Sequence, residues 1–197
     1  MTKKVWYAPN KFESYGEEEI KAVEACLRDG WLAGFGDRTI EFEKRVADLF
    51  GKKTGLFVNS GSSAILLGLC ALDLPKGSEV VTPACGFATT VAPLMQLGLK
   101  PVFCDVGLDS YVPTVEQLRK VVTPETKCLI IPNLIGNIPD WEAIRKAFPD
   151  LILFEDSADT ITHTPCTDIS TTSFYASHVI TAGGLGGMVM FNDDGHL

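Results

Sequence analysis

The sequence contains no run of about 18 uncharged apolar residues, which is the length that a membrane-spanning helix requires. Its first residues, MTKKVWYAPNKFESYG, also lack the apolar core of a secretory signal peptide. We therefore expect a cytoplasmic protein with no membrane partner.

Cysteine pairs and basic charge are scarce as well. The six cysteines form no CxxC or CxH motif, and most lie in apolar segments such as LLGLCALD, which indicates small buried side chains in a reducing compartment. Lysine and arginine number 17 against 25 aspartates and glutamates, so the formal net charge is -8. Because a nucleic-acid surface needs a basic field, we expect no nucleic-acid partner.

The sequence does have enough apolar content for a buried domain, since 46% of its 197 residues are hydrophobic. The apolar pattern alternates between strand-like and helical periodicity, which is typical of βα units. Strands are expected in TGLFVNS, EVVTPA, PVFCDV, KCLIIPN and LILFED, with helices over 61–72 and 87–97 and another from Pro139. Because these strands are apolar on both faces, we expect an α/β fold with three αβα layers around a mostly parallel sheet.

Both ends of the chain carry further signals. Ser14 and Glu17 have the spacing of a capping box, and the apolar positions that follow predict a helix ending at Gly30, with a second helix over 38–50. Beyond Asp159, two more strands are expected in TTSFYAS and GGMVMFN, on either side of a glycine-rich turn. The chain ends soon after the last strand, which suggests a truncated protein.

In an open α/β sheet the ligand site lies at the carboxyl ends of the strands, and polar residues gather there in three clusters. The first, Asn59-Ser60-Gly61-Ser62-Ser63-Ala64, is a strand-to-helix turn whose backbone amides would face an anion such as a phosphate. Ordinary helix capping also explains this motif, so that alternative stays open here. The turn lacks the GxGxxG pattern of a dinucleotide-binding domain.

The second cluster consists of Glu155, Asp156 and Asp159, at the end of an apolar strand. A buried carboxylate needs a cationic partner, and a pyridinium nitrogen is a partner that makes the ring an electron acceptor. A solvated acid that caps a turn is the alternative. The third cluster places Ser173 and the imidazole of His178 just before the glycine-rich turn, although a lone histidine is usually structural.

Together these clusters resemble the DegT/DnrJ/EryC1/StrS family of sugar aminotransferases and dehydratases, which has the fold of aspartate aminotransferase. The matching segments, in the family's order over residues 10–192, are GWLAGFGDRTIEFE, NSGSSAILL, TPACGFATTVAP, PVFCDVGLDSY, GNIPD, FEDSAD and TSFYASHVITAG. The resemblance implies a single cofactor-binding large domain of fold type I over residues 1–197, with an N-terminal helical arm and without the small C-terminal domain.

The resemblance also implies roles for individual residues. Gly61, Ser62 and Ser173 would hold the phosphate of the cofactor, and Ser63 would belong to the same cofactor-binding turn. Phe87 would stack on the pyridine ring. The expected cofactor is pyridoxal 5'-phosphate or pyridoxamine 5'-phosphate.

Two acids and one histidine complete the expected site. Asp156 would pair with the ring nitrogen, and Asp159 would support the region of the ring hydroxyl. Ordinary members carry a Schiff-base lysine five residues after the serine of an SFxxxK motif, whereas this chain has His178 there and no lysine after Lys146. Because histidine forms no stable Schiff base, the resemblance implies a diffusible pyridoxamine phosphate, with His178 as the catalytic base and acid.

This combination resembles the nucleotide-sugar 3-dehydratases, which implies 3-dehydration of a nucleotide-linked 4-keto-6-deoxy sugar. Two alternatives stay open: a sugar aminotransferase without its usual lysine, and a catalytically inactive binding fragment. Family members with an iron-sulfur cluster have a sequence similar to EDxCD where this chain has EDSAD. Ala158 stands at the position of the cysteine, so no cluster and no metal are expected. The segment with Trp31 and Phe35 resembles the part that reaches a partner subunit, so a homodimer is expected by analogy.

Overall fold

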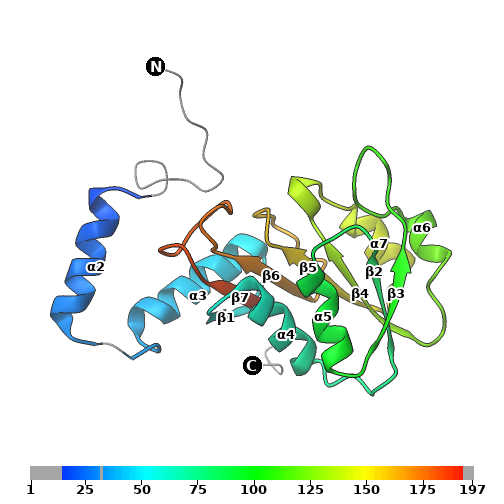
Figure 1. Ribbon diagram of the computed structural model, residues 1–197, viewed down its shortest axis with the longest axis horizontal. Helices are drawn as coiled ribbons and strands as arrows, with labels where there is room; N and C mark the ends of the chain where they lie inside the picture. The colour runs from blue at the N-terminus through cyan, green and yellow to red at the C-terminus, as the bar shows by residue number, and fades with distance from the viewer. Residues whose placement is uncertain (1–14, 32, 193–197) are drawn as a thin grey trace.

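The computed structural model describes residues 15–31 and 33–192, and Figure 1 shows a central sheet with helices on both sides. The sheet has seven strands in the order β1-β7-β6-β5-β4-β2-β3. Their bounds are β1 Thr54–Val58, β2 Glu79–Pro83, β3 Lys100–Cys104, β4 Thr126–Pro132, β5 Ile152–Ser157, β6 Ile169–Ser173 and β7 Gly187–Phe191. β7 runs antiparallel to β1 and β6, and all other pairings are parallel.

The helices form two outer layers. Their bounds are α2 Glu17–Asp29, α3 Asp37–Phe50, α4 Gly61–Ala71, α5 Ala88–Gln96, α6 Val115–Arg119 and α7 Trp141–Ala147, with a 3₁₀ turn at Leu134–Gly136. α4 and α5 cover one face of the sheet, where they pack on residues such as Ile130 and Val189. α3, α6 and α7 cover the other face, where they pack on the next residues of the same strands, such as Ile131 and Met190. Strand alternation therefore places apolar side chains on both faces of the sheet, where they form three clusters. Within the described ranges, none of these helices is long and apolar enough to cross a membrane.

The expected strands and helices are confirmed, with two differences at their ends. The pattern predicts a strand over 171–177, but β6 ends at Ser173, because its pairing with β7 stops there and the chain turns into a loop. At the N-terminal end, Ser14 lies outside the described residues. Helix α2 begins at Glu17, where the side chain of Glu19 accepts a hydrogen bond from the amide of Gly16 at 2.7 Å.

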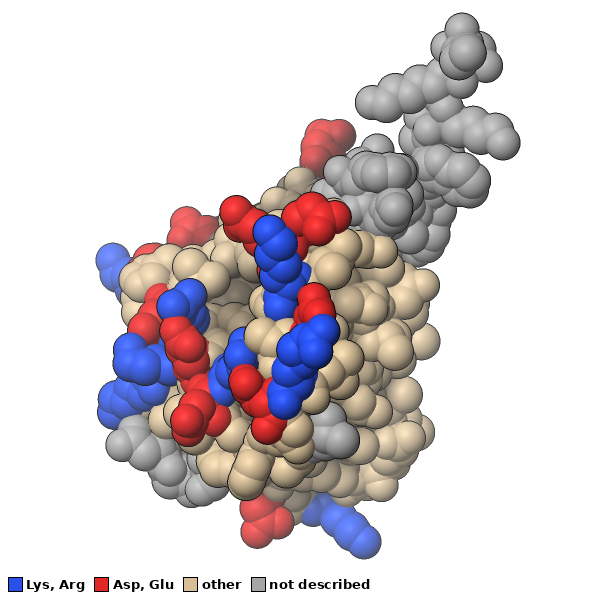
Figure 2. All heavy atoms as spheres, turned by 90° about the vertical axis from the view of Figure 1, so that its left-hand side faces the viewer, with Lys and Arg blue, Asp and Glu red and all other residues tan. Residues whose placement is uncertain are grey.

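Helix α2 lies apart from the sheet, at the left of Figure 1. None of its residues is buried, and the apolar side chains of Val23 and Leu27 are exposed. Figure 2 shows acidic and basic side chains interleaved on this side of the molecule, where Arg38 of α3 pairs with Asp29 of α2 at 3.2 Å. Polar contacts therefore link α2 to α3, and its apolar face is left uncovered in the described part of the chain.

The start of β7 lies directly against the turn that follows β1. Gly186 forms an isolated bridge with Ser60, and a Cβ added to Gly187 would lie 2.3 Å from the carbonyl carbon of Ser60. A Cβ added to Gly61 would lie 2.9 Å from the Cβ of Ser173 at the end of β6. Three backbone segments thus meet with no side chain between them, which fixes the turn on the ends of β6 and β7.

Gly187→Ala should lower the free energy of unfolding by about 3 kcal/mol or more, because no side chain fits between β7 and the backbone of Ser60. Urea unfolding of the purified chain measures this loss. Gly34→Ala is the matched control, since a Cβ there meets nothing within 4 Å, and its unfolding free energy should change by less than about 0.5 kcal/mol. Equal stabilities of Gly187→Ala and the native chain would contradict the packing.

Candidate active site

A cavity of about 500 Å³ opens at the carboxyl ends of β4, β5 and β6 and includes the turns after β1 and β2. Of the eight residues expected to bind the cofactor or to act in catalysis, seven line it, namely Gly61, Ser62, Phe87, Asp156, Asp159, Ser173 and His178. These residues come from segments up to 117 positions apart, 61 to 178, so the fold and not the chain order brings them together. Ser63 is the one that does not line the cavity.

The turn after β1 begins helix α4. The hydroxyl of Ser60 accepts a hydrogen bond from the amide of Ser63 at 3.1 Å. The backbone carbonyl of Ser60 accepts the first hydrogen bond of the helix, from the amide of Ala64, at 3.0 Å. The amides of Gly61 and Ser62 precede that bond and stand at the positive end of the helix, where they can donate to an anion. Ser63 is engaged in the cap instead, because its hydroxyl bonds to that of Ser60 at 3.1 Å. Capping and an anion site are therefore compatible here.

Asp156 lies at the end of β5 and is buried. Its Oδ2 accepts a hydrogen bond from Oγ1 of Thr90 on α5, at 2.8 Å. Burial raises the pKa of Asp156 from 3.8 to about 6, hydrogen bonds from Thr90 and the Ala158 backbone oppose that shift, and the negative charge of Asp159 adds to it. With so few donors the carboxylate has acceptor capacity left, which a cation in the cavity would use.

His178 lies in the loop between β6 and β7, close to Asp159. Its Nε2 is 3.9 Å from Oδ1 of Asp159, a distance suited to a charge interaction but too long for a hydrogen bond. Its Nδ1 is buried and has no hydrogen-bond partner among the described residues. The ring of Tyr175 packs against the imidazole in a T-shaped arrangement, with centroids 5.7 Å apart. The imidazole therefore packs against a neighbouring ring, and its buried Nδ1 is left without a hydrogen-bond partner among the described residues.

Asp159 also holds a strained turn at the edge of the cavity. Its Oδ2 accepts a hydrogen bond from the amide of Ile135 at 3.1 Å. Ile135 has a left-handed backbone, with φ of 54°, which a β-branched residue rarely adopts. Such strain persists only where surrounding contacts impose it. The carboxylate of Asp159 thus connects this turn with His178.

Several lining residues were not among those singled out from the sequence. Asn133 follows the apolar strand KCLIIPN, so the strand-end signal that pointed to Asp156 could have found it too. Tyr175 lies within the third polar cluster, two residues after Ser173. Thr90, which donates to Asp156, gives no such signal, because its role depends on where α5 lies beside β5.

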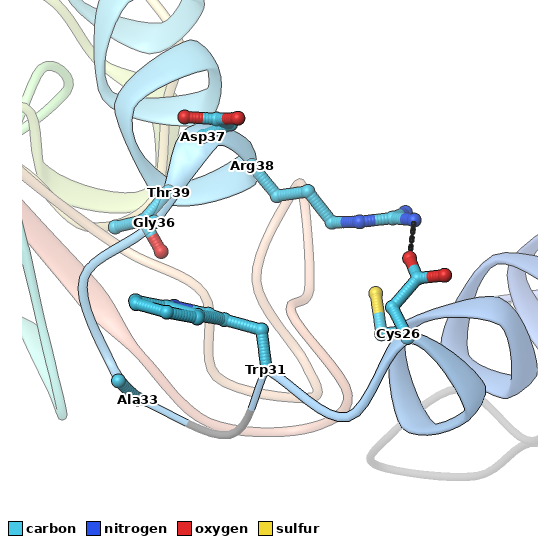
Figure 3. Close-up of a pocket in the computed structure, with 8 residues that line it drawn as sticks. Cys26, Trp31, Ala33, Gly36, Asp37, Arg38 and Thr39 are labelled. Atoms are coloured by element: carbon cyan, nitrogen blue, oxygen red, sulfur yellow. Dashed lines mark hydrogen bonds and ion pairs between the residues drawn. The ribbon is translucent and has the colours of Figure 1, made fainter.

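Outside this cavity the described residues offer few alternatives for a ligand. A second cavity, of about 540 Å³, lies between α2 and α3, where the ring of Trp31 lies below Gly36 and Arg38 reaches toward Asp29 (Figure 3). It includes none of the eight residues expected to bind the cofactor or to act in catalysis. In the part of the chain that the structure describes, no group of three or more His, Cys, Asp or Glu side chains is arranged to hold a metal ion. The expected absence of a metal cluster stays a prediction.

The model of the DegT/DnrJ/EryC1/StrS aminotransferase family matches residues 13–196 of this sequence. The chain belongs to this family. The resemblance carried by the seven segments is thereby confirmed. The fold agrees: a solved structure of E coli GDP-4-keto-6-deoxy-D-mannose-3-dehydratase with bound hydrated PLP is 29% identical and has a TM-score of 0.86, over 97% of this chain and 52% of that chain.

Curated relatives within the family include dehydratases and aminotransferases. The dTDP-4-dehydro-2,6-dideoxy-D-glucose 3-dehydratase of Saccharopolyspora spinosa is 37% identical, over 88% of this chain and 41% of its own length. The dTDP-4-dehydro-2,3,6-trideoxy-D-glucose 4-aminotransferase of the same organism is 33% identical, over 88% of this chain and 47% of its own length. The chain therefore spans less than half the length of these two relatives.

Asp156→Asn should stabilise the chain at neutral pH. The pKa of Asp156 is about 6 in the folded chain against an ordinary 3.8, so the folded state loses stability as pH rises through that window. Removing the ionisable group should raise the free energy of unfolding by about 3 kcal/mol near pH 7.5 and by almost nothing near pH 4. Urea unfolding at both pH values measures this, with the exposed Asp150→Asn as control. An equal change at the two pH values would be inconsistent with a buried acid.

Proposed function

We propose that this chain is the cofactor-binding part of a sugar-modifying enzyme that uses pyridoxamine phosphate to remove the 3-hydroxyl of a nucleotide-linked 4-keto-6-deoxy sugar. One observation carries the proposal: the imidazole of His178 lines the cavity where ordinary family members have a lysine. No lysine is among the described residues that line this cavity, and the sequence has none after Lys146. The 37% identity to a sugar 3-dehydratase supports the same assignment.

The residues of the cavity fit this cofactor. The amides of Gly61 and Ser62, with the hydroxyl of Ser173 beside them, would hold the phosphate at the start of α4. Asp156 would pair with the protonated ring nitrogen, which supplies the cation that its buried carboxylate lacks. Phe87 is 69% exposed and offers a ring face for stacking. When bound, pyridoxamine phosphate supplies an amine for a keto sugar and a ring that accepts electrons.

His178 is the proposed proton-transfer group. The carboxylate of Asp159 lies 3.9 Å from Nε2 of this histidine. The Nδ1 of His178 has no hydrogen-bond partner among the described residues. We assign the imidazole of His178 as the group that accepts a proton as base and returns it as acid to the departing hydroxyl.

A sugar aminotransferase is the second candidate, because a relative with that activity is 33% identical. A binding fragment without activity is the third, since the chain spans 41% and 47% of the two relatives. The products separate the three. With a 4-keto-6-deoxy nucleotide sugar and pyridoxamine phosphate, a dehydratase yields a sugar without its 3-hydroxyl, an aminotransferase yields an amino sugar that keeps it, and a binding fragment yields neither. Mass spectrometry distinguishes these products.

We also propose that the enzyme acts as a homodimer. Trp31 and Phe35 are 66% and 68% exposed, next to the uncovered apolar face of α2. The phosphates of the cofactor and of a nucleotide sugar carry several negative charges, yet no Lys or Arg is among the described residues that line the cavity. A second subunit would cover the apolar face and bring cations to the site.

His178→Lys should create a covalent attachment point that the native chain lacks at this position. After incubation with pyridoxal phosphate and reduction with borohydride, peptide mass spectrometry should find the cofactor attached to position 178 of the variant, because a lysine there reaches the cavity. His163→Lys is the matched control, since His163 is exposed and does not line the cavity. Labelling of both variants to the same extent would argue against a cofactor site at His178.

Asp156→Asn should weaken binding of pyridoxamine phosphate by about tenfold or more, because it removes the charge that meets the ring nitrogen. Isothermal titration calorimetry with the purified chain measures the change, and Asp150→Asn should bind like the native chain. Unchanged affinity in Asp156→Asn would remove Asp156 from the proposed site. The same variant is expected to be more stable than the native chain, so a loss of affinity is not explained by unfolding.

A further inference from the structure

Glu155 neighbours Asp156 on β5, but it is fully buried and does not line the cavity. Its carboxylate is surrounded by hydrogen-bond donors from four parts of the chain: the end of β4, β5, the loop after β5, and β6. The donors are Asn133 and Thr162 at 2.6 Å, Ser170 at 2.5 Å, Ser157 and Thr167 at 3.4 Å, and Thr164. The two oxygens of a carboxylate offer about four acceptor sites, so these donors fill the hydrogen-bonding capacity of Glu155.

Three of these donors, Thr162, Thr164 and Thr167, belong to the loop 158–168 that joins β5 to β6. The buried ammonium group of Lys52 donates to Oγ1 of Thr167 at 2.9 Å and to the carbonyl of Thr164. Burial lowers the pKa of Lys52 to about 8, and the negative charge of Glu155 opposes that shift. Two buried charged residues, Glu155 and Lys52, therefore hold this loop by hydrogen bonds to its threonines.

The same contacts reach the cavity through two residues that line it. Loop 158–168 carries Asp159 near its start, and Asn133 both lines the cavity and donates to Glu155. Two residues after Asn133, the amide of Ile135 donates to Asp159. Glu155 thus holds both partners of the Asp159–Ile135 hydrogen bond, one through the loop and one through the end of β4.

We propose that Glu155 is a positioning residue, whose carboxylate accepts hydrogen bonds from the hydroxyl groups of loop 158–168 and the side-chain amide of Asn133 and so holds Asp159 against Ile135 and beside His178. Its effect passes through Asp159, since Glu155 itself does not reach the cavity. The inference rests on the proposed function only where it makes His178 the proton-transfer group. The positioning itself belongs to the chain without cofactor.

Glu155→Gln tests the role of the charge. It keeps the size of the side chain but replaces one acceptor oxygen with an NH₂ group that faces hydroxyl donors. The loop should then open more often, and the amide hydrogen of Ile135 should exchange with solvent about tenfold faster or more. The chemical shift of the Ile135 amide hydrogen, which its hydrogen bond to Asp159 moves downfield, should also move upfield as that bond is lost more often. NMR of the ¹⁵N-labelled chain without cofactor measures both signals.

Glu79→Gln is the matched control. Glu79 is a buried strand carboxylate that accepts hydrogen bonds from Lys100 and Thr123, at the other end of the sheet. Its variant should speed exchange near Thr123 and leave both Ile135 signals unchanged. If Glu155→Gln lowers stability but leaves both Ile135 signals as in the native chain, Glu155 is structural only and the proposal is overturned.

Thr164→Val serves if Glu155→Gln does not fold, because it removes one donor and keeps the charge of Glu155. Exchange of the Ile135 amide should then be about threefold faster, and an unchanged rate would overturn the proposal. Failure of pyridoxamine phosphate to bind the native chain would count against the proposed function alone, since the NMR measurements contain no cofactor.

Discussion

The buried carboxylate of Asp156 is the constraint on which the site depends. Folding removes it from water with few donors, of which the Thr90 hydroxyl is one, so its ionised form costs stability at neutral pH. Folded proteins retain such groups where a ligand supplies the missing charge. Because β4, β5 and β6 end at the same edge of the sheet, this acid faces the same cavity as the start of α4 and the loop of His178.

The neighbouring acid on β5 has the opposite surroundings. Successive side chains of a strand point to opposite faces, so Glu155 turns toward the hydroxyl groups of loop 158–168 while Asp156 turns toward the cavity. The first carboxylate is saturated by donors, and the second keeps acceptor capacity for a ligand. The two neighbouring acids therefore differ in their surroundings: Glu155 is hydrogen-bonded within the protein, whereas Asp156 could still pair with a ligand.

The frame of the fold could be predicted because its local signals are strong, as in the apolar strands KCLIIPN and LILFED. Strand ends and the family resemblance together located seven residues of the cavity. Local sequence patterns do not predict which side chains of neighbouring segments contact one another. Thr90 acquires its role only when α5 lies beside β5, and Ser63, one position beyond Ser62, turns from the cavity to the helix cap. Ile135 has a left-handed backbone where its amide donates to Asp159, and an isoleucine gives no local sign of it.

Replacing an amine by an imidazole at position 178 changes what retains a cofactor in the proposed function. A lysine keeps its ligand by a covalent bond, whereas His178 leaves retention to the α4 amides, the charge of Asp156 and ring stacking. Each of these contacts contributes little binding free energy. Tight binding therefore requires that the protein groups are already ordered before the cofactor binds, so that binding costs no conformational entropy. The backbone junction at Gly61 and Gly187 and the hydrogen-bonded loop that carries Asp159 provide that rigidity. In the proposed function, the fixed backbone around the cavity would therefore offset the missing covalent bond to the cofactor.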